Sequence, residues 1–298
     1  IETGTVGKAN LIEEISRIHG FDRIPSRRLS AELPPQVGDS EVEFQELVRE
    51  ILVSLGLQDT LAYRQTSITR EAKLLPGALP DPTLRYIKIA NPISPERTVL
   101  RRSALATMLE LIERNCRLAD RLALFEIGPV FLPVEGQALP EEPKRLAIGL
   151  WGTQDLPTWT EKESAWMDFY DLKGIIEGLI QGLHLREVSF QPLSDHPTFH
   201  SGKAALILAG ETAIGVMGEI HPLVRQNYDF LDGAILAAEL YLDQIISLVE
   251  KGFHVRPISS FPAMVEDIAL IVDEEVPASQ VEALIRKAGG KLLVGARL

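Results

Sequence analysis

Two apolar segments near the middle of the chain, residues 122–132 and 145–151, are separated by an acidic loop that contains proline. This pattern indicates two antiparallel strands joined by a long loop. Four more segments have the character of short strands, and single helical patterns lie between them at irregular spacing. Those segments are residues 188–191, 204–208, 213–219 and 235–241. The order of strands and helices predicts an α+β fold with a mostly antiparallel sheet.

Several segments have the apolar spacing of amphipathic helices. They are residues 10–20, 40–55, 100–118, 169–183, 242–250 and 278–288, with a shorter one at 222–228. In the first helix Asn10 is a suitable N-cap, Glu13 follows three residues later as in a capping box, and Gly20 ends the helix. Further strands are predicted at residues 60–70, 85–90 and 267–272, and another begins at Leu292.

The net charge of −12 describes an acidic surface, which repels phosphate backbones and argues against broad nucleic-acid binding by the chain alone. The single cysteine, Cys116, cannot form an intrachain disulfide, as is typical of proteins in a reducing compartment. The longest strongly apolar stretches, such as residues 268–272, are too short to span a bilayer. We therefore expect a cytoplasmic protein with no membrane partner.

The chain has 298 residues, a length typical of about two domains, and it begins with Ile1 rather than Met. Residues 25–38 and 252–262 are rich in proline and have the character of linkers. The first helix has no preceding element to pack against, and the last predicted strand starts just before the chain stops. We therefore expect a piece of a longer protein.

The motifs of several common chemistries are absent from the sequence. There is no Gly-rich phosphate loop, C-x-x-C pair, H-E-x-x-H motif or G-x-S-x-G motif, so dinucleotide, zinc and serine-nucleophile chemistry have no support. His196 and His200 have a metal-like spacing, but Pro197 lies between them, so we favour structural roles for both and for His221. Cys116 lies on the apolar face of a predicted helix and is expected in the core.

Two groups of charged residues are each open to two interpretations. The adjacent carboxylates Glu13 and Glu14 lie in a predicted first helical turn, where they interact favourably with the helix dipole. We favour this interpretation from the residues alone; the alternative is a hard-cation site, because Mg²⁺ takes one or two carboxylates and several waters. The basic residues around the 100–118 helix form either a solvated face or a contact for another subunit or RNA. They are Arg101, Arg102, Arg114, Arg117 and Arg121.

A set of short motifs, spread along the chain in a fixed order, carries a family resemblance. They are LIEEI at 11–15, HGFDRIP at 19–25, NPIS at 91–94, LRRS at 100–103, LFEIGPVF at 124–131, DFYDLKG at 168–174, GEIHP at 218–222, FPA at 261–263 and DIAL at 267–270. Together they resemble the β subunit of bacterial phenylalanine–tRNA ligase (phenylalanyl-tRNA synthetase).

The resemblance implies three parts. Residues 1–36 are similar to the tail of the preceding β-subunit domain plus a linker. Residues 37–250 are similar to a class II aminoacyl-tRNA synthetase core, an antiparallel sheet flanked by helices. Residues 251–298 are similar to a linker and the truncated start of a ferredoxin-like anticodon-binding domain.

The resemblance also implies that the catalytic work belongs to another chain. In this family the α subunit binds ATP, makes phenylalanyl-adenylate and charges tRNA(Phe), whereas the β core keeps the fold without the active site. Class II chemistry needs arginines at the ATP phosphates, because developing charge must be neutralised. Residues 122–132 contain no arginine, and the strand 235–241 is followed by Leu242, Asp243 and Gln244. We expect no catalytic or cofactor-binding residues here and, because the editing site lies in earlier domains, no deacylation of tRNA.

The family carries a Mg²⁺ site shared with the α subunit, and Glu13 and Glu14 match it. Asn10 stands where the family usually has Asp, so one ligand charge is missing. We therefore expect Glu13 and Glu14 to be the metal-site residues of this chain, without tightly bound Mg²⁺ in the absence of the α subunit. The turn at residues 200–204 matches a family turn and is expected to be structural.

These expectations describe a non-catalytic scaffold that holds the α subunit in an α₂β₂ assembly and helps to place tRNA(Phe). The helices 40–55 and 100–118 are the candidate interface, and the strand edge after Leu292 is expected to be unpaired. The chain by itself is expected to self-associate through exposed apolar surface. One alternative is a free-standing class II-like ligase that adenylates a small acid, with Arg101 and Arg102 near the nucleotide. A second is an RNA-binding module, against which the net charge argues.

Overall fold

The computed structural model describes residues 7–28, 30, 35, 37–156, 158–160, 164–250, 252 and 261–297. The chain divides into two compact units, Ile1–Lys251 and Gly252–Leu298. Each unit is described by itself. No helix within the described residues is long and apolar enough to cross a membrane.

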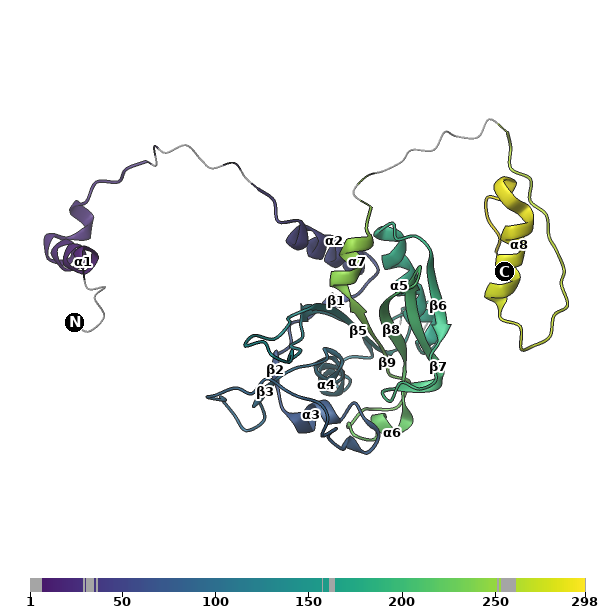
Figure 1. Ribbon diagram of the computed structural model, residues 1–298, viewed down its shortest axis with the longest axis horizontal. Coiled ribbons are helices and arrows are strands. Elements are labelled where there is room, and N and C mark those ends of the chain that lie inside the picture. Colours follow the sequence, from purple (N-terminus) through teal and green to yellow (C-terminus); the bar gives the residue numbers. More distant parts are fainter. Residues whose placement is uncertain are drawn as a thin grey trace. The chain divides into compact units, whose positions relative to one another are not determined.

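The first unit is built on a seven-stranded sheet (Figure 1). Its strand order is β1 (Gln58–Asp59), β4 (Arg121–Pro129), β5 (Lys144–Gly152), β9 (Leu236–Tyr241), β8 (Thr212–Ile220), β7 (Phe199–Ala209) and β6 (Val188–Pro192). Every neighbouring pair is antiparallel except β1 and β4, which are parallel. The prediction of an α+β fold with a mostly antiparallel sheet is therefore confirmed.

The predicted central hairpin has the longest uninterrupted strand pairing among the described residues of this sheet. Strands β4 and β5 pair over nine residues, with Phe125 opposite Ile148, and the bridge between Leu132 and Glu141 extends the pairing into the loop. The alternation of side chains places Phe125 and Ile148 on one face and Leu124 and Ala147 on the other. Both faces are buried, which explains why the two segments are almost continuously apolar.

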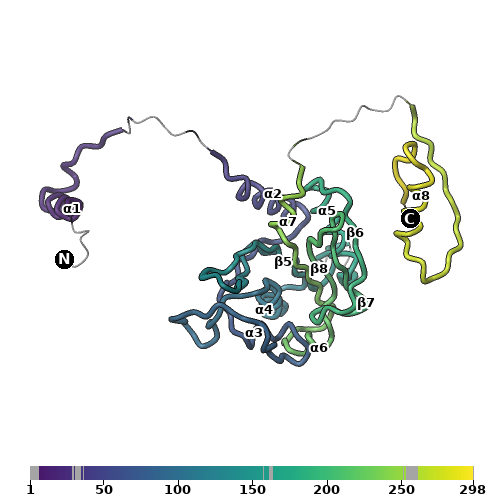
Figure 2. Tube along the Cα trace, viewed as in Figure 1, coloured from purple at the N-terminus to yellow at the C-terminus, as the bar shows by residue number. Residues whose placement is uncertain are grey.

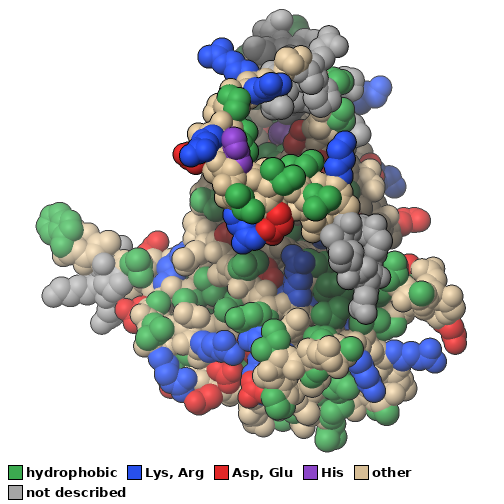
Figure 3. Space-filling view, turned by 90° about the vertical axis from the view of Figure 1, so that its left-hand side faces the viewer, with side chains coloured by type: hydrophobic (Ala, Val, Ile, Leu, Met, Phe, Trp, Pro, Cys, Tyr) green, Lys and Arg blue, Asp and Glu red, His purple; other side chains and the backbone are tan. Residues whose placement is uncertain are grey.

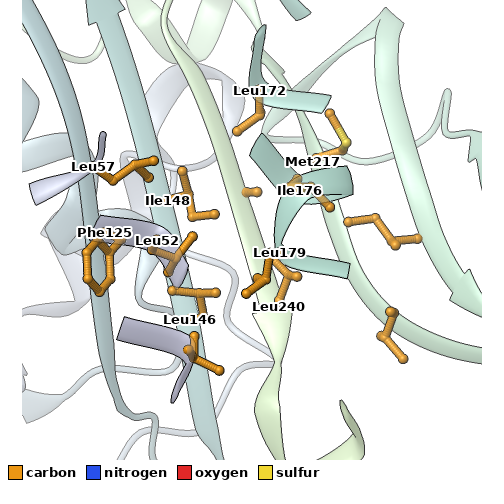
Figure 4. Packing of buried hydrophobic residues seen from close by; sticks show 14 of the residues in the cluster. Leu52, Leu57, Phe125, Leu146, Ile148, Leu172, Ile176, Leu179, Met217 and Leu240 are labelled. Atoms are coloured by element: carbon orange, nitrogen blue, oxygen red, sulfur yellow. The ribbon is translucent and has the colours of Figure 1, made fainter. Parts of the chain in front are cut away.

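One face of the sheet is covered by three helices, α2 (Ser40–Ser54), α5 (Phe169–Gly182) and α7 (Leu242–Leu248). Figure 4 shows the packing between them, with Leu52 of α2 and Ile176 of α5 against the sheet. Asp39 caps α2, and a capping box of Asp168 and Asp171 begins α5, so both helices start at clear sequence signals.

The other face is covered by α4 (Leu105–Asn115), which packs directly on β5. A Cβ atom at Gly149 of β5 would lie 2.7 Å from Ile112 Cδ1 and 2.8 Å from Met108 Cγ, so only glycine permits this approach. The apolar stripes of α2 and α4 therefore pack within the chain, because a two-sided sheet needs cover on each side. Val42, Leu47 and Val53 of α2 are exposed, and the interpretation of helices 40–55 and 100–118 as the candidate interface stays a prediction.

Between β1 and β4 the chain forms a group of small elements, of which α3 is labelled in Figure 2. They are β2 (Gln65–Thr66), α3 (Ile68–Ala72), the 3₁₀ turn Pro76–Ala78 and β3 (Val99–Leu100), while α6 (Pro222–Arg225) precedes β9. The strand predicted over 60–70 is reduced to β2, and the one over 85–90 to a bridge between Lys88 and Val99. Ser67 caps α3 and redirects the chain where the pattern alone indicated a strand.

The N-terminal helix α1 (Lys8–His19) is followed by the 3₁₀ turn Phe21–Arg23. Gly20 ends α1 as predicted, but the N-cap is Gly7 rather than Asn10, and no side chain caps it. The predicted capping box is therefore wrong, and Glu13 and Glu14 lie beyond the first turn, where the helix dipole no longer explains them. None of the residues of α1 is buried.

The second unit contains α8 (Ala278–Gly289) and the 3₁₀ turn Gly290–Leu292. The predicted helix is confirmed, but the strand predicted over 267–272 does not form, and residues 293–297 are not a strand either. A strand needs a neighbour to satisfy its backbone, and within the described residues of this unit none is formed. The prediction of an unpaired strand edge after Leu292 is corrected accordingly.

Candidate functional site

A group of charged side chains lies inside the first unit, where β3, α3 and the start of α4 meet the sheet. Its centre is Arg101, which follows β3 and is fully buried, paired with the buried Glu126 of β4. Arg101 Nη1 donates to Glu126 Oε1 at 2.8 Å and Oε2 at 3.0 Å. The guanidinium also donates to Pro129 O at 3.0 Å and Thr107 Oγ1 at 3.1 Å. The buried cation is therefore neutralised and held by residues of this chain.

The strand sequence provides the space for this pair. Glu126 and Gly128 are two residues apart on β4, so they share one face of the strand. A Cβ atom at Gly128 would collide with Arg101 Nη2. In the FEIG sequence of the LFEIGPVF motif, Glu126 thus provides the counter-ion and Gly128 leaves the space that the Arg101 guanidinium occupies.

A second carboxylate, Glu239 of β9, holds the start of α4. Glu239 Oε1 accepts from Ala104 N at 2.7 Å and from Ser103 Oγ at 2.9 Å. A carboxylate is favourable at a helix N-terminus, where backbone N–H groups have no partner within the helix. Burial raises the pKa of Glu239, and these two hydrogen bonds oppose the rise.

A third carboxylate, Glu71 of α3, is buried with little compensation. Its Oε2 accepts from Arg102 N at 3.3 Å, while its Oε1 has no hydrogen-bond partner. Burial raises the pKa of Glu71 to about 8, and the nearby charge of Glu239 adds to the rise. At neutral pH Glu71 is therefore largely protonated, in contrast to an exposed glutamate.

Two further cations near this cluster are also engaged within the chain. Arg102 Nη1 donates to Arg85 O at 2.6 Å, and Arg145 lies over the ring of Tyr241 at 4.5 Å. The turn from β9 into α7 presents Asp243, whose Oδ2 accepts from Lys144 N at 2.8 Å. The acid Asp243 thus lies at the turn between β9 and α7, where the family resemblance implies that an ATP-binding class II synthetase would need a cation.

Strand β4 differs in one respect from the sequence expectation. It begins at Arg121, so the strand does contain one arginine. Arg121 Nε donates to Gln154 O at 3.0 Å, and its Nη1 reaches Gly56 O at 3.5 Å. This arginine ties loops together at the start of the strand, five residues before Glu126.

The predicted metal-site residues lie away from this cluster in the sequence and do not form a cluster of their own. Glu13 and Glu14 are exposed on α1, and Glu14 forms an ion pair with Arg17. Within the described residues there is no group of three or more His, Cys, Asp or Glu side chains arranged to hold a metal ion. In the part of the chain that the structure describes, no third ligand of this kind joins Glu13 and Glu14, and their assignment as metal-site residues stays a prediction.

The other candidate residues have structural roles. His196, His200 and His221 each accept a backbone N–H at Nδ1, from Thr198, Gly202 and Leu223 respectively. Cys116 is buried in the core, as expected. Arg114 pairs with Glu110 and Arg117 with Asp229, which is the solvated-face interpretation of that helix. Arg101 fits neither interpretation, because it is buried.

Sequence reasoning missed the three carboxylates Glu71, Glu126 and Glu239. For the last two a signal was available, since an acid inside an otherwise apolar strand must have a buried partner. For Glu71 no signal was available, because α3 was not predicted.

Comparisons with known proteins agree with one another. The family model "Phenylalanyl tRNA synthetase beta chain CLM domain" matches residues 24–242. The chain is 35% identical over 297 residues to a protein of Clostridium tetani, covering 98% of this chain and 35% of that protein. It is 34% identical over 296 residues to one of Symbiobacterium thermophilum, covering 98% and 32%. Both are named phenylalanine–tRNA ligase β subunit. The chain thus spans about a third of the length of these relatives.

Solved structures support the fold. Two structures of pyrrolysyl-tRNA synthetase from Desulfitobacterium hafniense superpose with TM-scores of 0.52 and 0.53, at 14% and 13% identity. They cover 80% and 82% of this chain, and 74% and 80% of the matched chains. At this identity the likeness concerns the fold alone, that of a class II tRNA synthetase.

Proposed function

This chain belongs to the phenylalanyl-tRNA synthetase β-chain family, and we propose that it serves phenylalanine–tRNA ligase as a non-catalytic part. The whole enzyme would attach phenylalanine to tRNA(Phe) with ATP bound by the α subunit. This chain would hold the α subunit in an α₂β₂ assembly and help to place the tRNA. The observation that carries the proposal is the internal neutralisation of Arg101 by Glu126.

The absence of catalysis by this chain follows from its charges. An adenylation site must hold ATP phosphates with cations that are free to meet them. In the buried cluster Arg101 is bound to Glu126, and Glu71, Glu126 and Glu239 add carboxyl groups to the same region.

The alternative of a free-standing ligase rested on Arg101 and Arg102. The burial of Arg101 removes one of the two cations from any nucleotide, and Arg102 is engaged with Arg85 O. The ligase alternative is therefore less well supported than the scaffold. An RNA-binding module remains disfavoured by the net charge of −12.

We propose that Glu13 and Glu14 contribute to a Mg²⁺ site only when another chain supplies the missing ligands. Mg²⁺ keeps an octahedral shell and accepts one or two carboxylates with waters, so two exposed acids alone bind it weakly. Binding of Mg²⁺ would then report on assembly with the α subunit.

The division into a domain tail (1–36), a class II-like core (37–250) and the start of an anticodon-binding domain (251–298) is part of the same proposal. We also propose that the chain is located in the cytoplasm and that it self-associates when the α subunit is missing. Support for the core comes from the family match over residues 24–242.

Sedimentation of the chain with and without the α subunit of the same organism tests the proposal, with phenylalanylation assayed on the same samples. We expect a stoichiometric complex and no activity of the chain alone. Sedimentation of the two proteins as separate species would contradict the scaffold function.

A further inference from the structure

Residues 60–104, between β1 and α4, carry charge of the opposite sign to the rest of the chain. We name this segment the basic lobe. It contains eight Lys and Arg residues and three Asp and Glu residues, a net charge of +5 in a chain of net charge −12. Arg101 and Glu71 are buried, so the excess of five positive charges is carried by the other side chains.

Several cations of the basic lobe are accessible and lack an acidic partner. Arg64, Arg85 and Lys88 are exposed. Within the described residues neither Arg64 nor Lys88 forms an ion pair, and Arg85 reaches only Glu135, at 3.9 Å. Surface cations are normally balanced by nearby acids in an acidic protein, so this excess produces a local positive potential.

Two arginines of the basic lobe are held in place by aromatic rings. The guanidinium of Arg97 lies 3.3 Å from the ring centroid of Tyr63, and that of Arg102 lies 5.8 Å from Tyr86. Arg97 Nη1 is buried and has no hydrogen-bond partner, so this atom does not itself lie at the surface. A stacked guanidinium loses less conformational freedom when it binds a carboxylate, which favours use of these arginines in recognition.

The basic lobe also exposes aliphatic side chains. Leu61, Leu79 and Ile93 are 88%, 73% and 86% exposed. Ile93 lies in a loop closed by the bridge between Lys88 and Val99, so it is held near the cations rather than on a free tail. Figure 3 shows the left-hand side of the view in Figure 1, with Lys and Arg among hydrophobic side chains and some Asp and Glu over its lower part.

This combination favours a protein partner over a nucleic acid. Leucine and isoleucine gain nothing from a phosphate backbone, whereas protein interfaces combine an apolar centre with enriched Arg and Tyr. We propose that the basic lobe is the surface on which this chain receives the ligase α subunit, through a patch of that subunit that is acidic and partly apolar. The inference rests on the proposed function and adds the surface and its chemistry.

The test is a charge reversal, Arg85→Glu with Lys88→Glu, in the full chain. Both side chains are exposed and make no close ion pair, so the fold is not expected to change. The control is Lys287→Glu with Lys291→Glu in the second unit, which changes the net charge equally. We expect affinity for the α subunit at low salt to fall at least tenfold in the lobe variant and less than twofold in the control.

Two other measurements complete the test, the salt dependence of α-subunit binding and the binding of tRNA. For the original chain, affinity for the α subunit is expected to fall as salt is raised. Equal affinity of the original chain and the lobe variant would overturn the inference and leave the scaffold function intact. Failure of the original chain to bind the α subunit would overturn the scaffold function itself. Loss of tRNA binding by the lobe variant, with α-subunit binding unchanged, would identify an RNA surface and overturn the inference.

Discussion

Removal of Glu126 leaves Arg101 as a fully buried charge without its counter-ion. In Glu126→Ala the guanidinium loses both bonds to the carboxylate and keeps those to Pro129 O and Thr107 Oγ1. Breaking a buried pair from one side costs about 3–5 kcal/mol, because the remaining charge stays desolvated. For a domain of this size the melting temperature is then expected to fall by about 6–20 °C.

Urea unfolding followed by circular dichroism measures the loss, and a second variant separates charge from packing. Arg101→Met with Glu126→Leu removes both charges and keeps apolar volume, so we expect stability within about 1 kcal/mol of the original or higher. Glu96→Gln is the control for an exposed pair, since Glu96 binds Arg70 at the surface, and we expect a change below about 1 kcal/mol. If Glu126→Ala unfolds within about 1 kcal/mol of the original chain, the description of the cluster as a mutually dependent buried pair is wrong.

Three further outcomes follow from the same structure. Because the pKa of Glu71 is raised to about 8 in the fold, ionisation of this side chain opposes folding. The free energy of unfolding should therefore fall as pH rises from about 4.5 to 8, by up to about 1.4 kcal/mol per pH unit. Glu71→Gln should lose this pH dependence, which unfolding curves at pH 5, 6, 7 and 8 would detect. Gly149→Ala should destabilise the chain by about 1–3 kcal/mol, because the added Cβ meets Met108 and Ile112. Gly174→Ala, whose added Cβ has no atom within 4 Å, should instead stabilise α5 by up to about 1 kcal/mol. The melting temperatures of the two variants should therefore shift in opposite directions. Calorimetric titration of the chain with Mg²⁺ should give no saturable binding below millimolar concentration, and Glu13→Gln with Glu14→Gln should not change that result.

The sequence predicted best where local signals and burial act together. Helix α2 starts at Ser40 as predicted because Asp39 caps it, and the β4–β5 hairpin follows from two apolar runs buried on both faces. Prediction failed where a short apolar run found no partner. Residues 267–272 form a short apolar run of the kind found in strands, but among the described residues of the second unit no neighbouring strand forms. A strand-like sequence favours pairing, but a strand forms only where another strand lies beside it.

The buried cluster of the candidate site could not be predicted from the sequence. The lack of arginine at the expected positions indicated a core without catalysis, which stays a prediction, and the structure shows how the buried Arg101 is held. Its partner Glu126 is 25 residues away in sequence, and the hydrogen bonds between them depend on tertiary packing that spacing cannot show. Likewise, Glu71 acquires its raised pKa from the burial of α3, an element that the sequence did not reveal.

Phenylalanine-dependent exchange of pyrophosphate into ATP tests the central claim most directly. The assay detects adenylate formation, the step that needs free cations at the ATP phosphates. We expect exchange by the chain alone to equal the background without enzyme, and exchange to appear when the α subunit is added. Exchange by the purified chain alone would show that its buried cluster can serve ATP, and would contradict the claim that this chain is a non-catalytic scaffold.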